Sequence, residues 1–181
     1  MGIEIEKKYR LTREQHEALA RRLRESGAVY VCEEFEENTL YAGGSLDLSR
    51  QVLRLRRVDG KATLTYKERS TSASTIKRYR EDETLVEDAQ ALAAILDALG
   101  FKPTLVYEKR RATWHLKGAE VVVDELPFGL FVEIEGEEDC IMEVEQSLGL
   151  AEAEAETATY PELARKHGDK RGDVIESRFL P

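Results

Sequence analysis

Alternation between hydrophobic and charged residues marks the start of the chain. In residues 3–10, IEIEKKYR, the apolar and most of the charged side chains fall on opposite faces of an extended strand, because successive strand residues point in opposite directions. The same period of two recurs in residues 51–58, 61–69, 76–86, 106–116, 120–126 and 129–135. Residues 28–42 alternate more loosely. The sequence therefore predicts about eight strands, most of them with one apolar and one charged face.

Helical periods separate some of these strands. Residues 12–27 open with a capping box from Thr12 to Gln15 and end at Gly27, and residues 87–100 form a second amphipathic segment. Residues 138–149, the Ala/Glu run 151–157 and residues 160–168 are also expected to be helical and polar, followed by a charged tail. Asp59-Gly60 predicts a tight hairpin, and the small polar residues 70–75 predict a mobile loop.

The length and composition suit one globular domain in the cytoplasm. The 181 residues are 41% hydrophobic and 35% charged, with no apolar run near the roughly 18 residues of a membrane span and no secretory leader. We expect a single domain over residues 1–181, with a core of about 3–167 and a polar tail over 168–181. Neither the two cysteines nor the three histidines have zinc-site spacing.

The net charge of −9 argues against nucleic acid as the main partner, since nucleic-acid binding usually needs a basic face. The absence of an apolar span likewise argues against a membrane as partner. The sequence leaves both a monomer and a homodimer open.

Charged residues two apart recur on the predicted strands. The basic positions are Arg54, Arg56, Lys67, Lys109 and Arg111, and the acidic positions are Glu4, Glu6, Glu81, Glu83, Asp124, Glu133 and Glu135. The amphipathic helices need an apolar sheet surface to cover, and the strands supply one if their apolar faces point outward. We therefore predict an α+β fold: a closed or nearly closed eight-stranded antiparallel β-barrel, a tunnel with charges inside and helices packed outside.

The opposite arrangement is the main structural alternative. A barrel with a charged exterior and an apolar interior would hold an apolar ligand, as up-and-down barrels do. It explains the alternation, but exposed strand faces favour threonine and mixed polar residues, and these faces are nearly all Glu, Asp, Arg and Lys. Such a barrel predicts that Glu4→Gln or Arg54→Ala changes stability by no more than about 0.5 kcal/mol.

An interior that carries both signs of charge must hold water, ions or a charged ligand, because unpaired buried charges cost several kcal/mol each. Carboxylates two apart on a strand offer the oxygen ligands that Mg²⁺ or Mn²⁺ prefers. Arginine and lysine side chains donate hydrogen bonds to phosphate. A divalent metal together with a polyphosphate would satisfy both signs.

The N-terminal Glu4-x-Glu6-x-Lys8 resembles the ExExK signature of the CYTH superfamily, the triphosphate tunnel metalloenzymes. Later motifs of that family are matched in the same order by Arg54 and Arg56, Lys67, Glu81 and Glu83, Lys109 and Arg111, Asp124, and Glu133 and Glu135. Tyr160 and Lys166 resemble the C-terminal segment that plugs one tunnel end. The resemblance spans about residues 3–167.

The resemblance implies an antiparallel eight-stranded tunnel that binds a triphosphate and Mg²⁺ or Mn²⁺. The metal ligands would be Glu4, Glu6, Asp124, Glu133 and Glu135. The phosphate ligands would be Lys8, Arg54, Arg56, Lys67, Lys109, Arg111 and Lys166. Catalysis would depend on Glu4, Glu6, Lys8, Glu133 and Glu135, and the supporting residues would be Glu81, Glu83 and Tyr160.

The family contains inorganic triphosphatases, thiamine-triphosphatases and class IV adenylate cyclases. We expect hydrolysis of inorganic triphosphate, thiamine triphosphate or a nucleoside triphosphate, by metal-assisted in-line attack of water on the terminal phosphorus. Conversion of ATP to cyclic AMP and pyrophosphate is the alternative; it needs a nucleoside pocket, which no stretch indicates. A second alternative is a tunnel that binds polyphosphate or nucleotide without turnover, which the acidic pairs on the first and last strands disfavour.

Overall fold

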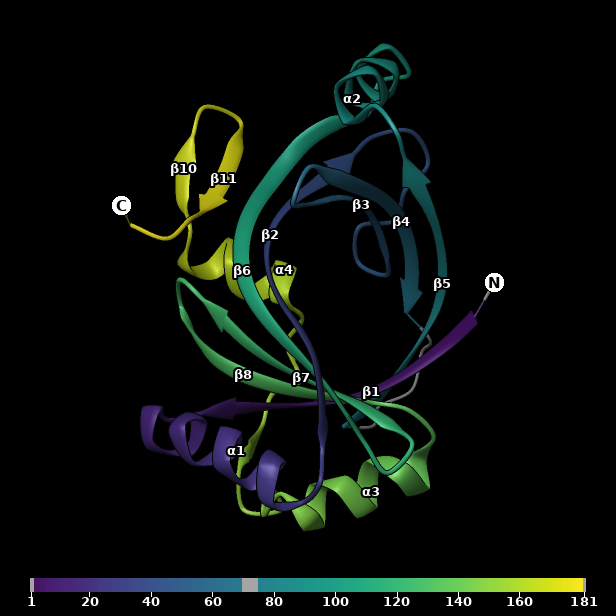
Figure 1. The fold of residues 1–181 in the computed structure, drawn as a ribbon. Coiled ribbons are helices and arrows are strands. Elements are labelled where there is room, and N and C mark those ends of the chain that lie inside the picture. The colour runs from purple at the N-terminus through teal and green to yellow at the C-terminus, as the bar shows by residue number, and fades with distance from the viewer. Residues whose placement is uncertain (1, 70–74, 181) are drawn as a thin grey trace.

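A closed antiparallel barrel forms the body of the molecule in the computed structural model, which describes residues 2–69 and 75–180 (Figure 1). Its strands are β1 (Gly2–Leu11), β2 (Val29–Ala42), β3 (Gln51–Val58), β4 (Lys61–Arg69), β5 (Ile76–Val86), β6 (Lys102–Leu116), β7 (Ala119–Leu126) and β8 (Gly129–Glu135). Neighbours around the barrel run β6-β2-β3-β4-β5-β1-β8-β7, and pairing of β6 with β7 closes it. The predicted α+β barrel is confirmed.

Helices cover the apolar outer face of the barrel, as predicted. α1 (Arg13–Glu25) and α3 (Glu138–Ser147) lie beneath β1, β7 and β8 in Figure 1, where Leu23 and Ile141 join one fully buried cluster. α2 (Ala89–Ala98) buries Leu96 against Leu55 of β3 in a second cluster. Because these apolar side chains point outward beneath helices, the charged side chains of the same strands point inward.

One end of the barrel interior is nevertheless apolar, because a helix fills it. α4 (Tyr160–His167) begins at a capping box formed by Thr159 and Glu162, as its sequence predicts. Its residues Tyr160 and Leu163 pack against inward-facing side chains of the strands, including Phe131 of β8. The helix closes one end of the barrel, so the charged part of the interior is a cavity plugged on that side.

Residues 151–157 are not helical, which corrects the prediction for the Ala/Glu run. The segment forms turns and the short strand β9 (Glu154–Ala155), which pairs with Tyr9 and Arg10 of β1. The pairing of β1 with β5 ends at Lys7, so the backbone of β1 beyond that point has a free edge that β9 can use. Strand pairing therefore overrides the helical propensity of alanine and glutamate.

The polar tail is folded onto the barrel, although its sequence predicts no strand. β10 (Asp169–Arg171) and β11 (Val174–Ser177) form a hairpin, and β11 adds to β6 in parallel (Figure 1). Arg178 fixes the segment by hydrogen bonds to Glu37 of β2 and Glu108 of β6, at 2.7 Å each. The extra strand covers an edge that the barrel alone would leave open.

The predicted hairpin at Asp59-Gly60 and the predicted loop at 70–75 can also be compared with the structure. The Asp59-Gly60 hairpin between β3 and β4 is confirmed, with positive φ angles of 45° and 79° at these residues. The loop predicted for residues 70–75 lies, except for Thr75, outside the residues that the structure describes. None of the helices in the described parts of the chain is long and apolar enough to cross a membrane.

Candidate active site

A cavity of about 270 Å³ lies inside the barrel, next to the plugging helix. Strands β1 and β3–β8 and the start of α4 supply its walls. Of the residues that the sequence predicts for the site, those lining it are Glu4, Glu6, Lys8, Arg54, Arg56, Lys67, Glu81, Glu83, Lys109, Arg111, Glu133, Glu135 and Tyr160. The structure therefore brings most of the predicted residues to one place, although they are up to 156 positions apart in the chain.

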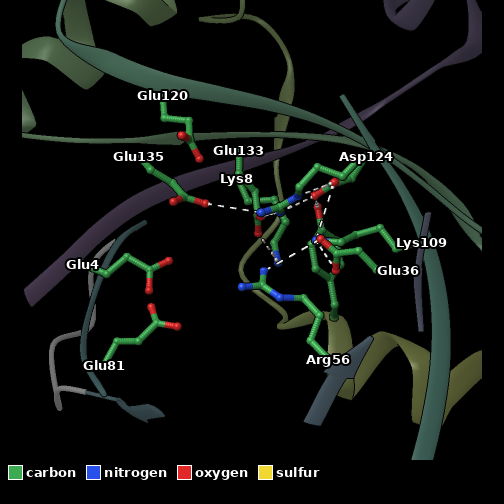
Figure 2. Close-up of polar contacts among 12 residues, drawn as sticks. Glu4, Lys8, Glu36, Arg56, Glu81, Lys109, Glu120, Asp124, Glu133 and Glu135 are labelled. Atoms are coloured by element: carbon green, nitrogen blue, oxygen red, sulfur yellow. Dashed lines mark hydrogen bonds and ion pairs between the residues drawn. The ribbon is translucent and has the colours of Figure 1, made fainter. Parts of the chain in front are cut away.

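One end of the cavity is acidic. Glu4, Glu6 and Glu135 each offer a carboxylate oxygen, and these oxygens all lie within 4.8 Å of one another. Glu6 and Glu135 are cross-strand partners of β1 and β8, which fixes them on the same face. Figure 2 shows Glu81 beside Glu4 and Glu120 beside Glu135, so further carboxylates surround this group. We call Glu4, Glu6, Glu81 and Glu135 the acidic end.

Burial and crowding make two of these carboxylates, Glu135 and Glu6, hard to ionise. Burial and the negative charges of Glu133 and Glu4 outweigh the attraction of Arg111 and raise the pKa of Glu135 to about 8. Burial and the neighbouring charge of Glu133 also raise the pKa of Glu6. A divalent cation would relieve this repulsion, and three hard oxygen donors at these separations suit Mg²⁺ or Mn²⁺.

Glu4 and Glu81 share a hydrogen bond at the same end. Burial and this bond raise the pKa of Glu81 to about 8, so Glu81 holds the proton. Burial raises the pKa of Glu4 as well, but the bond from Glu81 and the charge of Lys67 leave its pKa below the ordinary value. The Lys67 ammonium lies 2.6 Å from Glu4 Oε2 and 3.1 Å from Glu81 Oε2. Lys67 thus ties the acidic end to the basic residues.

The opposite wall of the cavity is basic, and carboxylates behind and beside it hold its side chains in place. We call Lys8, Arg54, Arg56, Lys109 and Arg111 the basic wall. Arg111 donates two hydrogen bonds to Asp124, at 2.8 and 2.7 Å, and a third to Glu133 at 2.7 Å. The Lys8 ammonium lies 3.3 Å from Glu133 Oε1 and 3.9 Å from the centre of the Tyr160 ring.

Glu83 orients the two arginines of β3. Its Oε1 lies 3.3 Å from Arg56 Nη2 and 3.7 Å from Arg54 Nη2, and it accepts a 2.6 Å hydrogen bond from the hydroxyl of Thr65. These contacts place Glu83, one of the two predicted supporting glutamates, beside the arginines, whereas Glu81 belongs to the acidic end.

Two predicted residues do not line the cavity. Asp124 is fully buried behind Arg111 and also accepts a 2.8 Å hydrogen bond from the hydroxyl of Tyr160, so its oxygens face donors of the protein. Within the described residues the group that could hold a metal does not include Asp124. Lys166 is exposed on α4, which presents Tyr160 to the cavity in its place.

Several buried polar residues of the interior were not predicted from the sequence. Glu36 of β2 is 1% exposed and lies beneath Lys109 and Arg56, and the loose alternation of residues 28–42 hides it. Lys77 faces inward beside Glu6 and is buried, although its position in β5 suggests the rim of the tunnel. Burial and the charge of Lys8 lower the pKa of Lys77 to about 8. The signal for Lys77 is its strand parity with the lining residues Tyr79, Glu81 and Glu83, whereas Glu36 has no lining residue on its own strand to mark its face.

Comparison with known proteins agrees with this geometry. A protein of Methanocaldococcus jannaschii named "Putative adenylate cyclase" is 28% identical over 137 residues, covering 74% of this chain and 76% of that protein. The structure of a Pyrococcus horikoshii protein has a TM-score of 0.77 at 28% identity, over 88% of this chain and 98% of that one.

A Hippeastrum protein, described as a putative adenylyl cyclase that reveals a dominant triphosphatase activity, shares the fold. Its TM-score is 0.68 at 18% identity, over 100% of this chain and 98% of that one. The sequence model of the CYTH domain matches residues 2–165, nearly the whole chain. With the ordered charged motifs inside a closed tunnel, this match shows that the chain belongs to the CYTH domain family.

Proposed function

We propose that the protein hydrolyses a triphosphate in the presence of Mg²⁺ or Mn²⁺. The observation that carries the proposal is the division of one cavity into an acidic end and a basic wall. A triphosphate is strongly anionic, so the basic wall suits its phosphoryl groups, and the acidic end suits the divalent ion that accompanies it. Membership of a family whose members are generally metal-dependent enzymes supports the same reading.

Different side chains of the cavity would bind the phosphoryl groups and the divalent ion. Arg54, Arg56, Lys109 and Arg111 would donate hydrogen bonds to phosphoryl oxygens, and Lys8 would contribute from the strand that also carries Glu4 and Glu6. Glu4, Glu6 and Glu135 would hold the ion, which when bound neutralises charge on the phosphoryl oxygens and favours in-line attack by water. α4 excludes bulk water from one end, which strengthens each of these electrostatic contacts.

The size and lining of the cavity favour a compact substrate. Pockets for drug-sized ligands usually measure about 300–1,000 Å³, and this cavity measures about 270 Å³. Its uncharged lining residues include Val52, Tyr79, Tyr107 and Pro161, and the rest is mostly charged. A triphosphate chain fits this description better than a whole nucleotide, so inorganic triphosphate is the preferred substrate.

Phosphorus NMR of the protein with inorganic triphosphate, thiamine triphosphate or ATP tests the proposal. Each substrate is supplied with Mg²⁺ or Mn²⁺, and a parallel sample contains EDTA. Metal-dependent release of orthophosphate is expected, fastest with inorganic triphosphate. Absence of product together with shifted or broadened ligand signals would point to a binding module, contrary to the proposal.

Cyclisation of ATP is the second candidate, because the M. jannaschii relative carries the name of an adenylate cyclase. The same spectra distinguish it, since a cyclase yields pyrophosphate and cyclic AMP, and a triphosphatase acting on ATP yields orthophosphate. Pyrophosphate with cyclic AMP as the main products would replace hydrolysis as the assigned function.

A further inference from the structure

β2 is the barrel strand that contributes no side chain to the lining of the cavity, as far as the described residues show. It nevertheless lies between β3 and β6 in the sheet, the two strands that carry Arg54, Arg56, Lys109 and Arg111. Its inward-facing residues are buried: Glu36 is 1% exposed and Asn38 is 0% exposed. A carboxylate is thus enclosed directly behind the side chains that face the substrate.

Glu36 contacts one basic residue on each neighbouring strand. Its Oε2 lies 3.4 Å from the Lys109 ammonium on β6, and its Oε1 lies 3.8 Å from Arg56 Nη1 on β3. Asn38, two residues further along the same face of β2, donates a 3.1 Å hydrogen bond to Oε2. The carboxylate is therefore fixed by its own strand and bridges the two strands beside it (Figure 2).

Lys109 is held from two sides. Besides Glu36, the Asp124 carboxylate lies 3.6 Å from its ammonium, and neither carboxylate lines the cavity. Both contacts are ion pairs rather than short hydrogen bonds, so the two buried carboxylates hold the ammonium by charge at the wall of the cavity that Lys109 lines. Arg56 is held in the same way, between Glu36 and Glu83.

Attraction of an anionic substrate does not explain Glu36. A negative charge directly behind the basic wall reduces the attraction of that wall for phosphate. Lysine and arginine side chains, however, lose rotamer freedom when they bind a ligand, and a fixed partner removes part of that entropic cost in advance. The position of Glu36 fits this second effect, because it reaches one base on each neighbouring strand.

We propose that Glu36 is a positioning residue that fixes Lys109 and Arg56 in the orientation that binds the phosphoryl groups of the substrate. The proposal rests on the proposed function for the identity of the ligand. It differs from the metal and phosphate assignments above, because Glu36 touches neither the substrate nor the ion and acts through two other side chains.

Two variants distinguish a positioning role of Glu36 from a purely electrostatic effect of its negative charge. Glu36→Gln keeps the size of the side chain and removes its charge, whereas Glu36→Asp keeps the charge and shortens the reach. We expect both to weaken binding of inorganic triphosphate about tenfold, the scale of a modest displacement of binding groups. If Glu36 acts only through its charge, Glu36→Gln binds triphosphate more tightly and Glu36→Asp is unchanged, and that pattern would overturn the proposal.

Isothermal titration calorimetry in EDTA measures this binding without turnover. Glu33→Gln is the matched control, because Glu33 is exposed on the same strand and its substitution changes the net charge equally. Thermal melting by circular dichroism checks that each variant folds. If Glu36→Gln does not fold, Glu36→Asp retains the buried charge and tests the proposal alone.

NMR of the Lys109 side chain provides a readout that needs no ligand. The ¹⁵Nζ signal, assigned with Lys109→Arg, should be sharp in the unmodified protein and broadened by fast exchange in both Glu36 variants. Triphosphate binding without hydrolysis would refute the proposed function and leave the positioning role intact. If the protein binds no triphosphate, the Lys109 signal alone tests the positioning role. A signal as sharp in the Glu36 variants as in the unmodified protein would then refute positioning.

Discussion

Glu133 and Glu135 lie two residues apart on the same face of β8, yet their surroundings shift their pKa values in opposite directions. Burial raises the pKa of both, but the charges of Lys8, Arg111 and Lys109 dominate at Glu133 and lower its pKa to about 2. At Glu135, burial together with the charges of Glu133 and Glu4 outweighs the attraction of Arg111, and its pKa rises to about 8. Glu133 is a counter-ion of the basic wall, whereas Glu135 belongs to a group in which carboxylates outnumber the cations near them.

The comparison shows how one strand face serves two purposes. A shift of two residues, about 7 Å along a strand, moves a glutamate from a region where cations surround it to a region where other carboxylates do. The basic wall is therefore already charge-paired within the protein. The acidic end is paired only in part, chiefly by Lys67, and a divalent ion would neutralise the remaining negative charge.

The largest expected effect is the loss of turnover at the acidic end. Glu6→Gln removes a carboxylate of the group that could hold the ion and keeps the size of the side chain. We expect the metal-dependent rate to fall on the order of a thousandfold, the loss typical when a key electrostatic group is removed. Orthophosphate release measures it, with Glu17→Gln on the exposed face of α1 as control. Wild-type activity in a folded Glu6→Gln protein would contradict the assignment.

Replacement of the two glutamates of β8 tests the comparison directly. Glu133→Gln leaves Arg111 and Lys8 short of a buried partner, so we expect the free energy of unfolding to fall by about 3 kcal/mol. Glu135→Gln removes a crowded charge, so in EDTA it should be neutral or stabilising. Urea unfolding of both variants at pH 8 measures the difference. Equal destabilisation by the two substitutions would show that the two ends do not differ.

The pH dependence of stability sharpens the same contrast. Glu81 and Glu135 have an ordinary pKa of 4.5 and a folded-state pKa of about 8, so they favour the folded state while they are protonated. That contribution is complete below pH 4.5 and is lost as the pH rises through 8. In EDTA we expect the free energy of unfolding to fall by about 1–3 kcal/mol between pH 5 and pH 9, because solvent in the cavity reduces the full effect.

Urea unfolding at a series of pH values measures this fall. Glu135→Gln should reduce the slope, since it removes one of the two titrating groups, and millimolar Mg²⁺ should restore stability at high pH by binding the ionised carboxylates. A slope that Glu135→Gln leaves unchanged would assign the pH dependence to other groups.

An effect of similar size on stability is expected where α4 meets the basic wall. Tyr160→Phe removes the hydroxyl that donates to Asp124 at 2.8 Å and keeps the ring beneath Lys8. Loss of a hydrogen bond to a charged acceptor should lower the free energy of unfolding by about 1.5–3 kcal/mol. Thermal denaturation with and without triphosphate measures it. A larger loss would indicate that the hydroxyl also fixes Arg111 through Asp124.

Much of the fold and the site could be predicted because both depend on strand parity. Alternation in strands such as β1 and β8 assigns each residue to a face, and the need of the helices for an apolar surface decides which face is inside. The position of Asp124 behind Arg111 could not be predicted, because the distinction between a cavity-lining carboxylate and a buried one depends on which side chain across the sheet reaches it. The strands β9 and β11 were missed because they pair with edges that exist only in the folded barrel.

Lys166 provides the smallest expected effect and separates two ways in which α4 could act. The resemblance assigns a phosphate contact to this residue, yet its side chain is exposed and does not line the cavity, whereas Tyr160 does. We expect Lys166→Ala to change the free energy of unfolding by no more than about 0.5 kcal/mol, as for other exposed side chains, and to leave triphosphate hydrolysis unchanged. Phosphate release at sub-saturating triphosphate is the sensitive measurement. A clear rise in KM would mean that α4 turns Lys166 toward the substrate on binding, so that the helix recognises phosphate as well as closing the barrel.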